Sequence, residues 1–318
     1  MRAMITGGAG FIGSNMAERL IAEDHSVTVF DNLHGGNIDF LGELLGHPRF
    51  RFIHADLLDL NAVVHAMENQ DIVFHLAANS DIPAGRRQTD IDLRLGTLAT
   101  YNVLEAMRRS QVGNLAFASS SVVYGEATVM PTPEDYGPLL PISLYGASKL
   151  ACEGLISAFC HNHGLQAWIF RFANICGRHG THGILVDMIQ RLRANSKRLE
   201  VLGDGRQSKP YLHVSECVDG ILFAIGAARD QLNFFNLGAP GSTSAECTAR
   251  LLLEAMELPE TELTFAGGYR GWPGDVARVQ LDCGKLANLG WRAKRSSYEA
   301  VALAASELVE ELSCKLSS

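Results

Sequence analysis

The chain has 318 residues, of which 47% are hydrophobic and 19% charged, and its formal net charge at pH 7 is −8. This length and hydrophobic content suit one large domain or two closely joined ones. The acidic balance argues against a nucleic-acid partner, which usually meets a basic face, and no apolar run reaches the ~20 residues of a membrane span.

The seven cysteines are widely spaced, and none belongs to a Cys-x-x-Cys pair. This spacing is typical of reduced thiols in a cytoplasmic protein and does not resemble that of a metal centre. The N-terminus enters an apolar strand after a single Arg2, without the architecture of a signal peptide. We therefore expect a cytoplasmic protein with no membrane partner and no metal site.

Short apolar runs alternate with helical patterns through the first half of the chain. The runs predicted as strands are residues 3–5, 27–30, 51–53, 72–76, 115–118 and 168–170. Helices are predicted between them at residues 12–23, 60–68, 92–110 and 146–162. Strands that alternate with helices predict an α/β fold, a Rossmann-type doubly wound parallel sheet with right-handed crossovers.

After about residue 172 the alternation becomes irregular. Helical patterns return at residues 184–195, 215–228, 243–257 and 298–314. We expect two domains with a soft boundary. Residues 1–173 form the Rossmann domain, to which later segments return, and residues 174–318 form mainly a smaller mixed α/β domain.

The first predicted strand leads into a glycine-rich turn, Gly8-x-Gly10-x-x-Gly13, and a helical pattern follows it. Such glycines permit a tight turn, close backbone approach to a pyrophosphate and close packing of helix on strand. The helix N-terminus adds free N–H groups that hold phosphate. A plain glycine turn is the alternative, and the position between strand and helix favours a dinucleotide site.

Asp31 ends the second predicted strand, 18 residues after Gly13. A carboxylate there accepts hydrogen bonds from the adenosine ribose hydroxyls and repels a 2′-phosphate, which favours NAD over NADP. The alternative is a turn residue before Asn32. Asp56, after the third strand, is a candidate for contact with adenine, and a surface turn explains it almost equally well.

Tyr145 and Lys149 lie four residues apart in a predicted helix, so their side chains share one face. A neighbouring ammonium stabilises the phenolate of a Tyr, whose ordinary pKa is about 10, and makes it a general base near neutral pH. Taken alone, such a pair is common. Ser119, Ser120 and Ser121, however, end a predicted strand, and strand ends in this fold line the ligand crevice.

Together these motifs resemble the extended short-chain dehydrogenases/reductases, in particular the NAD-dependent sugar-nucleotide epimerase/dehydratase family. The resemblance is carried, in the family's order, by residues 6–13, 31–32, 75–78, 119–125, 145–149, 171–174 and 203–205. It implies that residues 1–173 bind NAD and that residues 174–318 mainly bind a nucleotide sugar. It also implies a homodimer joined through the helices at 92–110 and 146–162, with packing inside the domain as the alternative.

The resemblance assigns roles to single residues. Tyr145 becomes the base, Lys149 its partner and a ligand of the nicotinamide ribose, and Ser120 the catalytic hydroxyl. The implied cofactor set is Gly7, Gly10, Phe11, Ile12, Gly13, Asp31, Asn32, Asp56, Leu57, Leu76, Ala77, Ala78, Tyr145 and Lys149. The implied substrate set is Ser120, Ser121, Tyr145, Asn174, Lys209 and Arg270, the last three near the diphosphate of a UDP-sugar.

The reaction is inferred from two positions after Ser120. Dehydratases of the family carry an Asp-Glu pair there and decarboxylases keep the Glu, whereas this chain has Ser121 and Val122. The resemblance therefore favours C4 epimerisation of a UDP-hexose through a transient 4-keto sugar. An Asn at 174, where uronate enzymes often have Thr, argues against UDP-glucuronate.

The sugar itself stays open. Val279 stands where a bulky Tyr is typical of the hexose-specific bacterial members, so it either leaves room for a 2-acetamido group or merely fills a strand. UDP-glucose/UDP-galactose and UDP-GlcNAc/UDP-GalNAc are both compatible. The alternatives are a 4-epimerase of UDP-glucuronate, another NDP-sugar oxidoreductase, and an NAD-binding regulator without turnover.

Three positions depart from the family pattern. Gly96 stands where an Asn usually braces the active-site region, which puts the support of Lys149 in question. Lys209 replaces an Arg, and a Lys holds phosphate as a point charge without a bidentate fork. Trp272 replaces a second Arg, for which Arg270 is the expected substitute; a solvated loop charge is the alternative for Arg270.

Three histidines invite a functional interpretation. His75, at a strand tip, is expected to be a satisfied core histidine near the cofactor and not a base. His179 and His182 have metal-like spacing, but no Cys or carboxylate stands at a fitting offset. A loop-ordering role or a substrate contact is therefore favoured over a metal site.

Overall fold

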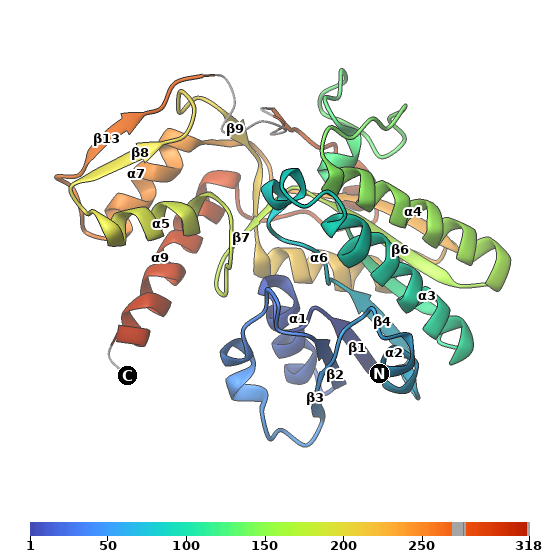
Figure 1. Cartoon of the computed structure of the whole chain (residues 1–318). Coiled ribbons are helices and arrows are strands. Elements are labelled where there is room, and N and C mark those ends of the chain that lie inside the picture. Colours follow the sequence, from blue (N-terminus) through green and yellow to red (C-terminus); the bar gives the residue numbers. More distant parts are fainter. Residues whose placement is uncertain (269–275, 277, 317–318) are drawn as a thin grey trace. The chain divides into compact units, whose positions relative to one another are not determined.

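The computed structural model describes residues 1–268, 276 and 278–316, with side chains as far as residue 312 (Figure 1). The chain forms two compact units. The first comprises Met1–Gly125, Gly137–Arg171 and Ile221–Phe235, and the second comprises Glu126–Tyr136, Phe172–Gly220 and Asn236–Ser318. Which ligand each unit binds stays a prediction.

The first unit is built on a seven-stranded sheet with the strand order β11-β6-β5-β4-β1-β2-β3. Its strands are β1 (Arg2–Thr6), β2 (Ser26–Asp31), β3 (Phe50–His54), β4 (Ile72–His75), β5 (Asn114–Ser120), β6 (Gln166–Phe172) and β11 (Leu232–Leu237). Strands β3, β2, β1, β4 and β5 pair in parallel. The order reverses between β1 and β4, where sheets of this kind bind ligands. The predicted fold class is confirmed.

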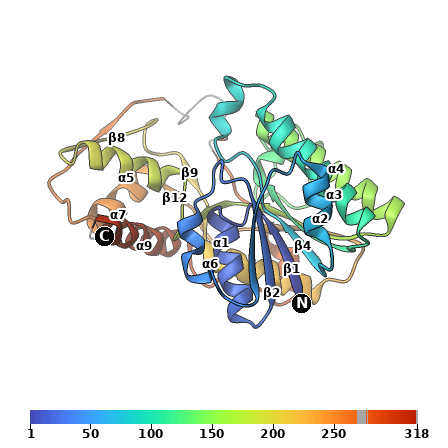
Figure 2. The same ribbon diagram turned by 60° about the horizontal axis from the view of Figure 1, so that its bottom comes forward.

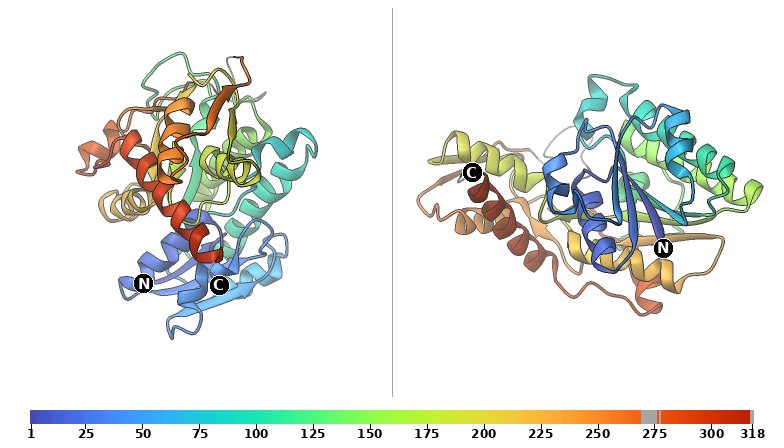
Figure 3. Two further views of the ribbon diagram at one scale, coloured as in Figure 1. Left: turned by 90° about the vertical axis from the view of Figure 1, so that its left-hand side faces the viewer. Right: turned by 90° about the horizontal axis from the view of Figure 1, so that it is seen from below.

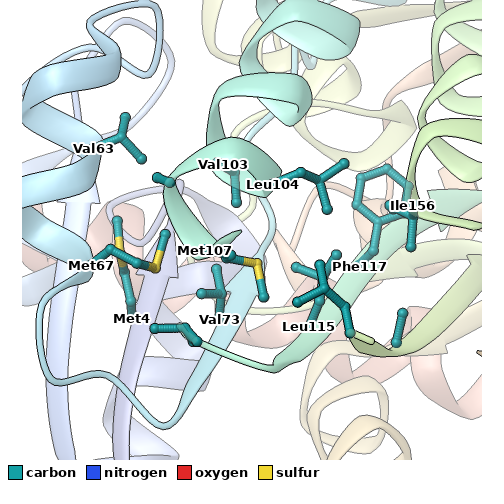
Figure 4. Packing of buried hydrophobic residues seen from close by; sticks show 14 of the residues in the cluster. Met4, Val63, Met67, Val73, Val103, Leu104, Met107, Leu115, Phe117 and Ile156 are labelled. Carbon is teal, nitrogen blue, oxygen red and sulfur yellow. The ribbon is translucent and has the colours of Figure 1, made fainter. Parts of the chain in front are cut away.

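Helices cover both faces of this sheet, as its apolar strands require. The helices α2 (Leu60–Met67), α3 (Ala99–Arg109) and α4 (Leu144–His163) pack on one face, and α1 (Phe11–Ala22) covers the other (Figure 2). Between α2, α3 and the sheet lies a core of fully buried side chains (Figure 4). Its labelled members include Met4, Val63, Val73, Val103 and Leu115.

Helix α4 begins and ends with recognisable caps. The Ser143 hydroxyl accepts a hydrogen bond from the Gly146 N–H at 3.1 Å, and Gly164 ends the helix in a left-handed conformation with φ of 71°. Both are standard devices for satisfying the open backbone groups of a helix. Helix α4 thereby fixes the place of the predicted Tyr145 and Lys149.

The helix predicted at residues 92–110 is not one regular α-helix. Residues Leu93–Leu98 form a wide π-helical turn, η3, and α3 follows from Ala99. Gly96 lies in the turn, and glycine has low helix propensity. Such turns are frequent at functional sites. The predicted helix is therefore present, continuous from residue 91 to 109, and the π-helical form of Leu93–Leu98 within it was not predicted.

Strand β11 was not expected, because Asn233 and Asn236 interrupt its apolar pattern and Asn is depleted in strands. Both asparagines are buried. The Asn233 side chain donates to the Ala167 and Asp230 carbonyls, and that of Asn236 donates to the carbonyls of Thr132 and Asp282. These bonds satisfy polar groups that would otherwise oppose burial.

In the described part of the second unit, short strands pair in twos: β7 (Asn174–Cys176) with β10 (Tyr211–His213), β9 (Ser208–Lys209) with β12 (Thr243–Ser244), and β8 (Arg198–Val201) with β13 (Glu262–Phe265). The helices are α5 (Ile184–Ala194), α7 (Ala245–Ala255), α8 (Gly284–Asn288) and α9 (Ser297–Leu316). Helices α7 and α9 lie side by side (Figure 3).

Helix α6 (Val214–Ala227) begins in the second unit and ends in the first. No helix in the described ranges combines the length and hydropathy that a membrane crossing requires.

Candidate active site

The glycine turn after β1 leaves no space for side chains. Gly7 has φ of +70°, and a Cβ on it would lie 2.7 Å from the backbone N of Ala77. A Cβ on Gly13 would lie 2.2 Å from the Gly7 carbonyl oxygen. Helix α1 starts at Phe11 with no side-chain cap and no acidic residue in its first turn. Its first N–H groups are therefore suited to an anion, which fits a dinucleotide pyrophosphate.

Asp31 is held rigidly at the end of β2. Its Oδ2 accepts from the Ala9 N–H at 3.0 Å, and its Oδ1 accepts from the Leu33 N–H at 2.8 Å. Each carboxylate oxygen keeps a further lone pair for a ribose hydroxyl. The carboxylate is only 8% exposed, so a 2′-phosphate brought here would meet a poorly screened negative charge.

Asn32 and Asp56 join the ends of β2 and β3. The Asn32 side-chain amide donates to Asp56 Oδ2 at 3.1 Å, and Asp56 Oδ1 accepts from the Leu58 N–H at 2.8 Å. Leu57, between Asp56 and Leu58 in the chain, is buried, and its carbonyl accepts a hydrogen bond from the Asn102 side chain. The Asp56 carboxylate thus organises a turn, and its role toward adenine stays a prediction.

The predicted residues after β4 lie against the glycine turn. The Leu76 N–H donates to the Thr6 carbonyl at 3.1 Å, and the Ala77 backbone is the group that a Cβ on Gly7 would meet. The structure therefore brings Leu76 and Ala77 to the place where the cofactor set was predicted, beside Gly7 and Gly13.

His75 is a core histidine, as expected. It is fully buried, with Nδ1 2.6 Å from the Thr6 hydroxyl and Nε2 2.9 Å from the Thr100 hydroxyl. Burial, together with the charge of Lys149, lowers the pKa of His75 to about 3, so the ring is neutral. The Cys152 thiol donates to the same Thr100 hydroxyl. Together these buried polar contacts join β1, β4, α3 and α4.

Of the three serines at the end of β5, Ser120 is the one poised to act. Ser119 is buried, and its hydroxyl donates to Glu153 Oε1 at 2.6 Å; Ser121 is also buried. Ser120 is half-buried, and its hydroxyl oxygen accepts from the Val122 N–H at 3.4 Å, which leaves its proton available for donation. The choice of Ser120 is consistent with this geometry and stays a prediction.

Lys149 is buried beside the end of β5. Its Nζ donates to the Ala118 carbonyl at 2.6 Å and lies 5.7 Å from the centre of the Tyr145 ring. Burial lowers the pKa of Lys149 to about 8, against the opposing effects of Cys152, Glu153 and Asp92. Tyr145 and Lys149 thus share a face, as their spacing predicts.

The expected lowering of the phenol pKa is not produced by the chain's own groups. Burial, and after it the Asp92 carboxylate, raise the pKa of Tyr145 above its ordinary value. Asp92 was not singled out in the sequence. It is 2% exposed, and Asn79 donates to its Oδ1 at 3.0 Å, while its Oδ2 has no hydrogen-bond partner among the described residues. Further positive charge is therefore needed to ionise Tyr145 near neutral pH.

A buried ion pair joins Arg171 of β6 to Glu153 of α4, the helix that also carries Tyr145 and Lys149. Arg171 of β6 donates through Nε and Nη2 to the two oxygens of Glu153 at 3.0 and 2.8 Å, and through Nη1 to the Tyr124 hydroxyl at 3.0 Å. The Ser119 hydroxyl completes the set. Sequence reasoning missed this network, although Glu153 stands four residues after Lys149 and Arg171 is a charge inside an apolar strand.

Two predicted substrate residues lie in the second unit. Asn174 begins β7 and pairs with Tyr211 of β10, and Lys209 of β9 pairs with Thr243. The two residues belong to different two-stranded sheets, and Pro210 alone separates β9, which carries Lys209, from β10, the partner strand of Asn174. Arg270, the third predicted diphosphate residue, lies outside the described residues.

The loop after β7 is tied to helix α9. The backbone N–H of Arg178 donates to Glu307, and that of His179 donates to Glu311, both at 2.9 Å. His179 itself has φ of 63°. These bonds come from the backbone, so the loop-ordering role of the histidine side chain stays a prediction; in the described ranges no three His, Cys, Asp or Glu residues gather into a metal-binding group.

Comparison of the chain with known proteins agrees with a dinucleotide-binding enzyme. The model of the NAD dependent epimerase/dehydratase family matches residues 3–238. A dTDP-glucose 4,6-dehydratase of an Actinoplanes species is 30% identical over 95% of this chain and 96% of its own length. A UDP-glucose 4-epimerase of Mycolicibacterium smegmatis is 29% identical over 95% and 96%. A crystal structure of a UDP-galactose 4-epimerase is 34% identical and superposes with a TM-score of 0.88 over 98% of this chain and 100% of that one.

Proposed function

Because the chain belongs to the NAD dependent epimerase/dehydratase family, we propose that it interconverts the C4 epimers of a UDP-hexose through a transient 4-keto sugar. The predicted cofactor, NAD, is confirmed by this membership. The residues present fit it. Gly7 and Gly13 allow the close backbone packing of the turn, and the carboxylate of Asp31 is fixed at the end of β2, where it would accept hydrogen bonds from a ribose.

The observation that carries the choice of reaction is the end of β5. Ser120 offers a hydroxyl there, and the turn that follows, Ser121–Tyr124, has no acidic residue. Elimination of water from a 4-keto sugar needs a base that removes the proton at C5 and an acid for the leaving hydroxyl, which carboxylates at this turn would provide. Reaction at C4 alone needs a base for one hydroxyl, and Tyr145 supplies that.

The chain's residues then have separate tasks. Ser120 donates a hydrogen bond to the substrate O4 and orients it, while Tyr145 removes and later returns the O4 proton. Lys149, fixed by its bond to the Ala118 carbonyl, places an ammonium near the phenol and favours the phenolate. NAD, when bound, supplies the redox step by taking up and returning a hydride at C4, and its nicotinium charge adds to that of Lys149.

The substrate is proposed as a UDP-sugar held at its diphosphate by Asn174, Lys209 and Arg270. Lys209 and Asn174 both belong to the second unit, on strands of two different short sheets. Val279 is half-buried, and if it lines the sugar site a side chain of this size would leave room for a 2-acetamido group. We therefore propose UDP-glucose/UDP-galactose as substrates and include UDP-GlcNAc/UDP-GalNAc.

The rival proposals differ in what they need. Among the relatives are dehydratases, and for a dehydratase the polar but uncharged Ser121 would have to replace a carboxylate. A regulator without turnover would have no need for Ser120, Tyr145 and Lys149 together. UDP-glucuronate stays possible for the same C4 chemistry and is distinguished by substrate choice alone.

The direct test uses purified protein with UDP-glucose, UDP-GlcNAc and UDP-glucuronate in separate reactions, without added reductant, and NMR identification of products. Conversion at C4 of at least one hexose supports the proposal, and inertness toward all three contradicts it. Tyr145→Phe is expected to retain NAD and lose turnover by at least ~10²-fold. Tyr298→Phe, at an exposed tyrosine of the second unit, is the matched control and keeps full activity.

A homodimer and a cytoplasmic location belong to the same proposal. Helices α3 and α4 lie side by side, and Leu98 and Tyr101 at the start of α3 are 46% and 43% exposed (Figure 1). Exposed apolar groups on neighbouring helices suit an interface. A monomeric mass by light scattering would contradict the dimer. None of the six cysteines whose side chains the structure describes forms a disulfide, as suits the cytoplasm.

A further inference from the structure

The wide turn η3 lacks a side chain at Gly96, and another residue fills the space. Gly96 is buried. A Cβ built on Gly96 would lie 2.2 Å from the hydroxyl oxygen of Ser148 and 3.4 Å from its Cβ, and no other neighbour lies within 4 Å. The Ser148 side chain therefore occupies the place that a side chain at position 96 would take.

Ser148 uses this place to tie α4 to the wide turn. Its hydroxyl donates to the Asp92 carbonyl at 2.7 Å and lies 3.0 Å from the Thr97 hydroxyl. Asp92 immediately precedes the turn, and Thr97 stands next to Gly96 near its end. A hydroxyl has one proton to donate and two lone pairs to accept with, so both contacts are satisfied together. The side chain is 7% exposed, which keeps water from competing for either bond.

The contact lies next to the candidate catalytic pair. Ser148 directly precedes Lys149 and stands three residues after Tyr145, so a shift of α4 at Ser148 moves both. On the other side, Asp92 is itself held, because the Asn79 side chain donates to Asp92 Oδ1 and to the Asp81 carbonyl at 2.9 Å. A continuous set of bonds thus joins the loop after β4, the wide turn and α4.

We propose that Ser148 is a positioning residue that fits against Gly96, ties α4 to the wide turn, and thereby holds Tyr145 and Lys149 in place. Gly96 is then required, because any Cβ there pushes the Ser148 hydroxyl away from the Asp92 carbonyl. The functional part of this inference rests on the proposed function, in which Tyr145 is the base. Misplacement of reacting groups by about 1 Å is enough to slow a reaction by orders of magnitude.

The test is a double-mutant cycle of the wild type, Gly96→Ala, Ser148→Ala and the double variant, all assayed as holoenzyme with saturating NAD. Ser148→Ala and Gly96→Ala are each expected to lower kcat by roughly tenfold, with KM within about twofold of wild type. The double variant is expected to be no slower than Ser148→Ala, because both changes abolish the same bond. Ser157→Ala, on the same helix, is the control and keeps the wild-type kcat.

Two outcomes overturn the proposal. The first is a Gly96→Ala enzyme with wild-type kcat, because the methyl group is then tolerated without loss of the brace. The second is a double variant whose loss equals the product of the two single losses, because the sites then act independently. A merely structural contact would alter the melting temperature and leave kcat of the folded enzyme unchanged, which also contradicts the positioning role.

A second measurement separates this inference from failure of the proposed function. Amide hydrogen exchange in residues 144–149 is measured by mass spectrometry on the same four proteins, which requires no turnover. We expect faster exchange in both single variants and no further increase in the double variant. If the wild type converts no UDP-sugar, the epimerase proposal fails. Equal exchange in all four proteins would contradict the positioning role of Ser148, whatever the outcome for turnover.

Discussion

Replacing Glu153 by Gln tests whether the buried ion pair with Arg171 holds the candidate site together. The two side chains are 4% and 5% exposed, and Glu153 accepts three hydrogen bonds, two from Arg171 and one from Ser119. Glutamine keeps the volume of the side chain but removes the charge, so the Arg171 guanidinium is left buried without a counter-charge. Breaking such a pair from one side costs about 3–5 kcal/mol. At roughly 2–4 °C per kcal/mol, the melting temperature falls by about 10 °C.

The assay is urea unfolding followed by circular dichroism, with Glu105→Gln as the matched control. Glu105 also carries two arginine partners, but Arg108 and Arg109 are 44% and 46% exposed, so its loss costs about 1 kcal/mol or less. Replacement of both members of the buried pair, Glu153→Leu with Arg171→Met, is expected to recover most of the stability. If Glu153→Gln loses no more stability than Glu105→Gln, the reasoning about this pair is refuted.

Three further predictions concern the cofactor turn and the buried lysine. Gly13→Ala is expected to abolish bound NAD, measured after acid release, because its Cβ overlaps the Gly7 carbonyl, whereas Gly154→Ala, with open space around it, retains NAD. Asp31→Asn is expected to weaken NAD binding by about tenfold and to improve the affinity for NADP relative to NAD; an unchanged ratio by calorimetry would contradict the ribose role. Lys149 is less protonated in the folded than in the unfolded chain between pH 8 and 10.5, so its contribution makes unfolding free energy rise with pH there. Lys149→Met is expected to remove a rise on the order of 2 kcal/mol between pH 7.5 and 9.5, and the same slope in both proteins would refute the lowered pKa.

The first half of the fold was predictable because its signals are local. Apolar runs of strand length and the glycines at 7–13 each specify their own structure, and the structure follows them. The π-helical form of η3 escaped prediction because residues 92–110 carry a helical pattern throughout, and the contact of Gly96 with Ser148 joins residues that are distant in sequence.

The same distinction holds for the candidate site. The glycine turn, Asp31, Tyr145 and Lys149 have motifs with fixed spacing, so sequence alone points to them. Asp92, Glu153 and Arg171 act through partners on other elements, and only the folded chain brings those partners together. The raised pKa of Tyr145 likewise follows from its burial, which spacing along a helix does not reveal.

The most direct test of the central claim is the reaction of wild-type protein with UDP-glucose in D₂O, followed by proton NMR. The account predicts that the C4 epimer forms while the protons at C5 and C6 remain unexchanged, because no carboxylate follows Ser120 to move the C5 proton. Deuterium at C5, or a 4-keto-6-deoxy product, would contradict it and would place the chain among the dehydratases of its family.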